Sequence, residues 1–334
     1  MKVKLGMIVC LLVAVLLAVG CAPSAAPSGE GGYEAIRIVG ASLGSESTRA
    51  ALVLATVLNR YYPEIEWSSS SGPGSNANLV MIHDGRTVVG TTTKSGFISA
   101  FGLDKVDESR IRSINIPRPS ASRFFAIPAD KDWYDITDIP EGSTLCPGPP
   151  GTGVTRLSEI WVEVTGLSKD YFNWIPLGKD ELSDAWRAGK VDLALISPTG
   201  ESAYLMNMAL SPRGVKAMGL TPEQAAKAKA SRAFLEIGYE APAESNLTEI
   251  LPDIFKYNVL APTGVTYLSV RDDFPEEIAY KMAKIFDEHH DEIAEIFPGL
   301  RNGATPQLML SFAEAPMEMH SGVAKYYREK GYLK

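Results

Sequence analysis

The chain has 334 residues, of which 45% are hydrophobic and 22% are charged, so its composition is that of an ordinary globular protein. The formal net charge is −8 and no block of like charges occurs, which argues against a nucleic acid as partner. Two of the three cysteines lie within the first 21 residues, so the rest of the chain, with Cys146 alone, can form no internal disulfide. A body of about 300 residues exceeds what one hydrophobic core usually supports, which favours two domains.

The chain begins with the pattern of an export signal. Lys2 and Lys4 precede an apolar run at residues 5–20. A membrane span needs roughly 20 apolar residues, so this run is short for one. Residues 1–21 are therefore predicted to be a signal segment, and the protein is expected outside the cytoplasm.

Cys21 directly follows small residues at positions 18–20. This order matches the cleavage box of bacterial lipoproteins, in which a lipid is attached to the cysteine that becomes the new N-terminus. A plain signal peptide and an uncleaved anchor are the alternatives. On the lipoprotein interpretation, the lipid on Cys21 anchors the protein to the membrane, and residues 22–33, rich in Ala, Ser, Pro and Gly, form a flexible tether.

Strand-type segments then alternate with segments of helical periodicity. Residues 35–41 predict a strand, the polar turn at 42–48 follows, and residues 49–61 carry apolar side chains at helical spacing. The alternation continues to a buried strand at 191–197 and is typical of parallel sheets with helices on both faces. In such sheets, the loops after the carboxyl ends of the strands converge on the ligand site. Further along, residues 275–296 predict one long amphipathic helix.

The turn at residues 148–155, GPPGTGVT, is close to a phosphate-binding loop. It fits the pattern of Gly, four residues, Gly, Lys and Ser/Thr, except that Val154 replaces the lysine. Without that charge, the glycine-rich turn and the helix N-terminus after it predict the holding of an anion or carboxylate rather than phosphoryl transfer. Thr152 and Thr155 can add hydroxyl donors. The alternative is a strand-to-helix turn with a purely structural role.

Several stretches, in their order and spacing, resemble one family, the TAXI solute-binding proteins of tripartite ATP-independent periplasmic (TRAP) transporters. They are the lipoprotein box, the turn GASLGS at 40–45, CPGPPGTGVT at 146–155, AWRAGKVD at 185–192, GVTYLSVRDDFPEE at 264–277 and HSGVAKYYREKG at 320–331. The resemblance covers nearly the whole chain after Cys21.

The resemblance implies an α/β, two-lobed venus-flytrap fold, in which each lobe is a mainly parallel sheet flanked by helices and crossover strands join the lobes. Residues 34–122 and 262–334 are expected to form lobe I, and residues 123–261 lobe II. It further implies that a small carboxylate solute binds between the lobes and is delivered to the membrane subunits of a TRAP permease.

The resemblance and the Ser/Thr/Gly turns at strand ends together suggest a set of ligand-binding residues. These are Ser42, Ser45, Thr92, Thr93, Lys94, Arg118, Thr152, Gly153, Thr155, Ser197 and Thr199. The first turn departs from the family, because it lacks the usual second glycine and the tyrosines that follow. Lys94 stands where members carry an acidic residue. Lys94, Arg118 and Arg123 are therefore candidates to hold an acid by charge-assisted hydrogen bonds, the alternative being solvated basic side chains.

Two other functions remain open from the sequence. A lipoprotein that senses a solute and signals to a membrane partner without transport needs the same fold. An exported α/β hydrolase is less favoured, because none of the four histidines lies near a Gly-x-Ser-x-Gly sequence. His289 and His290 lie among acidic residues, but adjacent positions do not share a helix face, so a solvated face is favoured over a metal site. Cys146 is expected to be buried rather than nucleophilic. The protein is therefore expected to be no enzyme and to use no cofactor.

Overall fold

The computed structural model describes residues 33–93, 106–120, 123–150, 152–196, 203–231, 236–240, 254, 259–297 and 317–333. Residues 34–334 form one compact unit. The predicted signal segment, Cys21 and most of the tether lie outside the described residues. Among the helices that are described, none is long and apolar enough to cross a membrane.

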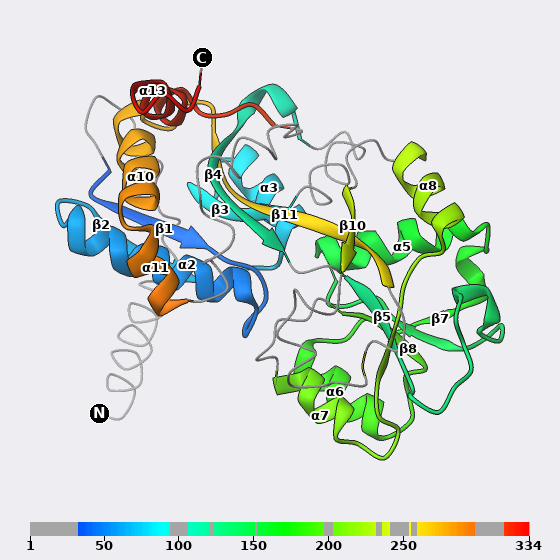
Figure 1. Cartoon of the computed structure of the whole chain (residues 1–334). Helices are drawn as coiled ribbons and strands as arrows, with labels where there is room; N and C mark the ends of the chain where they lie inside the picture. Colours follow the sequence, from blue (N-terminus) through cyan, green and yellow to red (C-terminus); the bar gives the residue numbers. More distant parts are fainter. Residues whose placement is uncertain are drawn as a thin grey trace, which may run out of the picture. The chain divides into compact units, whose positions relative to one another are not determined.

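The first sheet, within the described residues, contains six strands in the order β10-β11-β3-β1-β2, with β4 also paired to β11 (Figure 1). Their bounds are β1 (Ala35–Val39), β2 (Glu66–Ser70), β3 (Val89–Thr93), β4 (Ile111–Ser120), β10 (Glu236–Glu240) and β11 (Val259–Arg271). β1 runs parallel to β2 and β3, whereas β11 is antiparallel to β3, β4 and β10.

The second sheet has the order β7-β6-β8-β5-β9. Its strands are β5 (Phe124–Ile127), β6 (Thr144–Cys146), β7 (Asn173–Trp174), β8 (Leu193–Ile196) and β9 (Lys216–Met218). β6 is parallel to β7 and β8, and β5 is antiparallel to β8 and β9. The α/β fold is confirmed, with two mixed sheets flanked by helices.

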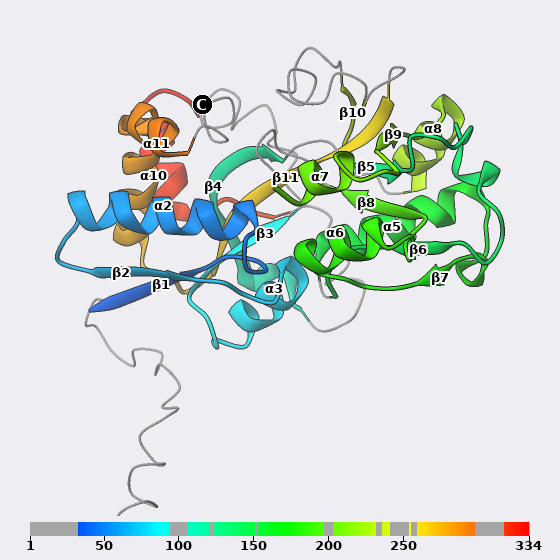
Figure 2. The same ribbon diagram turned by 90° about the horizontal axis from the view of Figure 1, so that it is seen from below.

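The helices flank these sheets. They are α2 (Glu46–Tyr61), α3 (Ser75–His83), α5 (Gly153–Thr165), α6 (Lys179–Arg187), α7 (Ala203–Ala209), α8 (Pro222–Ser231), α10 (Glu276–Glu288), α11 (His290–Ile296) and α13 (Ser321–Glu329). Figure 2 shows α2 on one face of the first sheet and α3 on the other. The long helix predicted at 275–296 is divided at His289, whose backbone leaves the helical region.

The core of the second sheet follows the strand alternation. Phe124 packs with Trp186 and Cys146 on one face, while Phe125 packs with Trp161 on the other. Cys146 is fully buried, and burial raises the pKa of its thiol. The expectation that Cys146 is buried is therefore confirmed.

His320 joins α13 to the loop before α10. Its side chain is 2% exposed. Nδ1 accepts a hydrogen bond from the backbone N–H of Gly322 at 3.2 Å, and Nε2 donates to the carbonyl of Phe274 at 2.8 Å. These partners fix the neutral tautomer, and burial is the main reason that the pKa of His320 is lowered. Arg112 also lowers this pKa, whereas the Phe274 carbonyl and Glu276 oppose the shift.

The buried neutral imidazole predicts a loss of stability in mild acid. Because the folded-state pKa lies below the unfolded value of about 6.5, the unfolded chain takes up this proton first as the pH falls. The free energy of unfolding should therefore decrease below pH 6.5, by at most about 1.4 kcal/mol per pH unit from this group. His320→Asn keeps a helix-capping side chain without the titration. In urea denaturation between pH 7 and pH 5, the wild type should lose more stability than this variant; equal losses would contradict the assignment.

Candidate functional site

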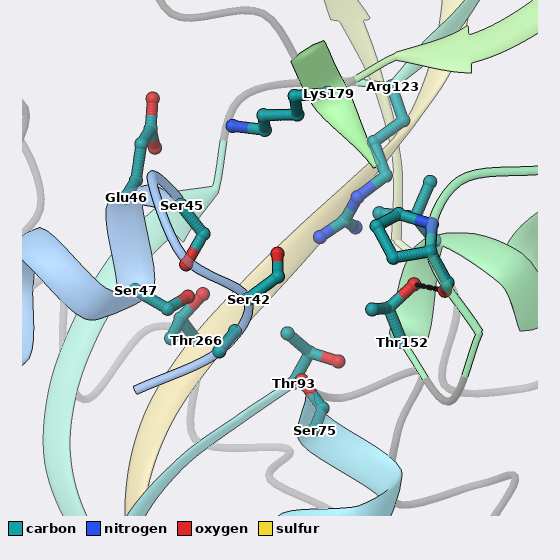
Figure 3. A pocket seen from close by; sticks show the side chains of 13 residues that line it. Ser42, Ser45, Glu46, Ser47, Ser75, Thr93, Arg123, Thr152, Lys179 and Thr266 are labelled. Atoms are coloured by element: carbon teal, nitrogen blue, oxygen red, sulfur yellow. Dashed lines mark hydrogen bonds between the residues drawn. The ribbon is translucent and has the colours of Figure 1, made fainter. Parts of the chain in front are cut away.

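A cavity of about 110 Å³ lies at the loops that follow the parallel strands (Figure 3). The loops after β1 and β2 and the last residue of β3 reach it from the first sheet, and the loops after β6 and β7 reach it from the second. The first sheet and its connections contribute Ala41, Ser42, Ser45, Glu46, Ser47, Ser75, Thr93 and Thr266. The second contributes Arg123, Pro149, Thr152, Val154 and Lys179. The prediction that strand-end turns converge is therefore confirmed for these turns, which meet at one cavity.

Four of the described helices begin at this cavity. Ser45 is the N-cap of α2 and Thr152 the N-cap of α5, and the side chain of each accepts a hydrogen bond from the backbone N–H three residues on. Ser75 and Lys179 are the first residues of α3 and α6. A helix N-terminus carries a partial positive charge and unpaired backbone N–H groups. Their convergence makes the cavity favourable for an anion.

Arg123 supplies a full positive charge at the same place. It immediately precedes β5, and because β5 is antiparallel to β8, this end of β5 lies beside the carboxyl end of β8, with Phe124 paired to Ile196. The guanidinium points into the cavity (Figure 3), yet the residue is only 4% exposed. Antiparallel pairing of one short strand therefore brings an arginine to an edge otherwise formed by parallel strands.

The surroundings of Arg123 leave its charge uncompensated. Nε has no hydrogen-bond partner, and no carboxylate of the described residues forms an ion pair with the guanidinium. Burial alone lowers the pKa of Arg123 to about 10, so the side chain stays protonated at neutral pH. A buried charge without a partner is costly to the fold. An anionic ligand would offset that cost.

Two further charged side chains line the cavity. Glu46 lies in the first turn of α2, where its carboxylate interacts favourably with the helix dipole. The ammonium of Lys179 lies 5.1 Å from the centre of the Tyr204 ring. Together with Arg123, these side chains give the described lining residues a formal charge of +1.

A larger cavity of about 540 Å³ adjoins the first and shares Ser42, Glu46 and Lys179 with it. Its other walls carry charged groups of both signs, including Arg49 and Asp180. The small cavity therefore opens into a polar outer chamber, and a solute longer than the inner cavity has room to extend.

The structure brings some of the predicted site residues together. Ser42, Ser45, Thr93 and Thr152 all line the inner cavity. The hydroxyl of Thr152 donates to the carbonyl of Pro149 at 2.7 Å, so its proton is already used within the turn.

Other predicted residues lie elsewhere. Thr92 is buried in the first sheet, with its hydroxyl 2.5 Å from that of Ser269. Thr155 donates to the carbonyl of Pro149 at 2.7 Å and is not among the described residues that line the cavity. Gly153 is the first residue of α5. Arg118 pairs through its backbone with Thr266. The predicted contacts Lys94, Ser197 and Thr199 lie outside the described residues.

Several lining residues were not predicted. Ser75 and Lys179 start helices that follow strands, so the strand-end rule that found Ser42 could have found them too. Thr266 reaches the cavity because β11 places it opposite Thr93. No local pattern marks such a residue, because an antiparallel partner strand has the same periodicity as a parallel one.

Residues 40–44 read Gly-Ala-Ser-Leu-Gly, which fits the spacing of a hydrolase nucleophile motif around Ser42. Such chemistry needs a histidine within reach of the serine. No histidine is among the described residues that line the cavity. His83 contacts Asp84, His289 stacks on Tyr61 and His320 is held by Phe274. Ser42 therefore lines the cavity as a polar residue and forms no catalytic triad with any of these three histidines.

Comparison with solved structures identifies other proteins of similar fold. XAC2383 from Xanthomonas citri, determined with a chloride ion, is 9% identical and matches 89% of this chain and 99% of its own, with a TM-score of 0.53. A protein from Bordetella bronchiseptica RB50 is 11% identical over 89% of this chain and 98% of its own, also with a TM-score of 0.53. The periplasmic aliphatic sulphonate binding protein SsuA from Escherichia coli is 15% identical over 91% and 84%, with a TM-score of 0.49. The first two similarities show a shared fold.

A periplasmic transporter of solved structure is 10% identical over 89% of this chain and 96% of its own, with a TM-score of 0.51, and shares this fold as well. The sequence model of the NMT1-like family matches residues 50–331, which is most of the chain. This protein therefore belongs to the NMT1-like family. A comparison with curated proteins found no match.

Proposed function

We propose that this protein is an extracytoplasmic solute-binding protein that captures a small organic acid and delivers it to a membrane permease. The observation that carries the proposal is Arg123, a buried guanidinium aimed into a cavity and lacking a carboxylate partner among the described residues. The helix N-termini around it favour the same sign of ligand charge. A carboxylate accepts two parallel hydrogen bonds from a guanidinium, which matches this donor in charge and shape.

The finer assignment rests on sequence. The stretches that resemble TAXI proteins support a TRAP permease as the partner, with residues 34–122 and 262–334 as one lobe and 123–261 as the other. The cleavage box supports a lipid on Cys21 that keeps the protein at the outer side of the membrane. Genes for TRAP permease subunits beside this gene would support the subtype, whereas genes for an ATP-driven transporter would contradict it.

The proposal is tested by thermal unfolding of the protein with a panel of small carboxylates. A bound acid stabilises the folded state by mass action, by about 2.7 kcal/mol at a concentration 100 times its Kd, so the melting temperature should rise with ligand concentration. The methyl ester of each acid is the matched neutral control and should give no shift. The proposal would fail if no carboxylate raised the melting temperature, or if only sulfonates or phosphates did.

A further inference from the structure

Four hydroxyl groups in the wall of the inner cavity have no partner. Ser42, Ser47, Ser75 and Thr266 all line it, and their side chains make no hydrogen bond to another described residue. Ser45 and Thr152 differ, because their hydroxyls cap helices. The cavity therefore offers free hydroxyls beside the guanidinium of Arg123, and Figure 3 shows the Ser42 hydroxyl and that guanidinium directed toward the same space.

Two of these hydroxyls belong to buried residues, where an unsatisfied hydrogen-bonding group is costly. Ser75 is 7% exposed and Thr266 is 9% exposed. A hydroxyl both donates and accepts, whereas a carboxylate only accepts and a methyl group does neither. A ligand that satisfies several such groups in both roles is one that carries hydroxyls of its own. A purely aliphatic acid would desolvate them without replacing the hydrogen bonds that they make to water.

The charges in the wall limit the ligand further. Among the described lining residues, Arg123 and Lys179 oppose the single acid Glu46, so the net formal charge of this part of the lining is +1. One carboxylate on the solute balances it. A second carboxylate would meet that of Glu46 at the α2 end of the cavity, and like charges at close range are unfavourable.

We infer that the solute is a small hydroxylated monocarboxylate, bound with its carboxylate on Arg123 and its hydroxyls on Ser42, Ser75 and Thr266. This inference rests on the proposed function and specifies its substrate class. The inner cavity, at about 110 Å³, is somewhat smaller than an engineered cavity of about 150 Å³ that holds benzene. An acid of three or four carbons therefore fits, with the outer chamber available for a longer one.

The test is isothermal titration of the protein with five acids of one three-carbon skeleton: propanoate, lactate, glycerate, alanine and malonate. Lactate and glycerate should bind at least about tenfold more tightly than propanoate, because only they satisfy the free hydroxyls. Alanine and malonate should bind more weakly than lactate. The ammonium group of alanine adds a positive charge near Arg123, and malonate carries one negative charge more than is needed to balance the described lining.

Two variants test whether these wall hydroxyls cause the preference for hydroxylated acids. Ser75→Ala and Thr266→Val should each lower the affinity for lactate and glycerate by about tenfold, and should raise the affinity for propanoate, which no longer has to desolvate an unsatisfied hydroxyl. Thr56→Val is the matched control, because Thr56 is on the outer side of α2, where its hydroxyl donates to the Leu52 carbonyl. If either wall variant fails to fold, the other variant and the titrations of the wild type with the five acids still test whether the solute is hydroxylated.

The outcomes separate this inference from the proposed function. Equal binding of propanoate and lactate overturns the hydroxylated class and leaves an acid-binding protein. Tighter binding of alanine or malonate than of lactate also overturns the inference of a hydroxylated monocarboxylate and leaves an acid-binding protein. If none of the five acids binds and the wider carboxylate panel also fails, the proposed function itself is overturned.

Discussion

Replacing Arg123 with methionine is expected to lower the affinity for a carboxylate solute more than 100-fold. The methionine keeps much of the buried apolar volume and removes the only buried guanidinium among the described lining residues. Truncating one partner of a buried, hydrogen-bonded charge pair costs about 2–5 kcal/mol of binding free energy. The unliganded protein should respond in the opposite way. Its free energy of unfolding should be unchanged or higher, because an uncompensated buried charge has been removed.

Titration calorimetry and urea denaturation on the same samples check both parts. Arg123→Lys should bind with intermediate affinity, since lysine keeps the charge but lacks the planar fork that matches a carboxylate. Arg187→Met, on an exposed turn of α6, is the control and should bind like the wild type. Wild-type affinity in Arg123→Met would remove this arginine from the site.

Trp161→Ala is expected to destabilise the fold by about 3–5 kcal/mol. Trp161 lies on α5, is 2% exposed and packs with its ring centre 4.7 Å from that of Phe125 on β5. It therefore fixes the helix whose first turn contains Thr152 to the strand that follows Arg123. Losing the ring leaves a cavity between these two parts of the site.

Trp161→Phe is the matched control. Phenylalanine retains most of the packing and removes an indole N–H that has no hydrogen-bond partner, so it should cost less than about 1.5 kcal/mol. Urea denaturation of both variants measures the difference in the free energy of unfolding. A change below 1 kcal/mol for Trp161→Ala would show that the second sheet does not depend on this contact.

The sequence allowed one part of the site to be predicted because a local rule applied. Ser42 and Thr152 follow parallel strands and precede helices, and both the strand alternation and the turn residues are visible in the chain. The absence of a lysine from the GPPGTG turn led to the prediction that this turn holds an anion and does not take part in phosphoryl transfer. The direction of the Thr155 hydroxyl could not be predicted in this way. The geometry of the turn decides whether this hydroxyl faces a ligand or the Pro149 carbonyl, and in the structure it donates to that carbonyl.

The sequence named Arg123 only as one of three basic candidates and did not indicate Thr266, because the positions of both depend on strands of opposite direction. Arg123 and Thr266 come to the cavity through the antiparallel pairing of β5 with β8 and of β11 with β3. An apolar strand has the same pattern in either direction, so the sequence does not reveal which of its ends meets the site. The burial of Arg123 was also hidden, since an arginine in a sequence is by default a surface residue.

The helix N-termini around the cavity have a consequence for the conditions in which the protein works. Backbone dipoles bind no protons, and Arg123, with its pKa near 10, keeps its charge throughout the mildly acidic to mildly alkaline range. No histidine is among the described residues that line the cavity. On the proposed function, the attraction that Arg123 and the helix N-termini exert on an acid therefore stays nearly constant while the acidity outside the cell varies. Capture through these groups should follow the ionisation of the solute, so the protein would continue to collect its acid in surroundings that the cell does not buffer.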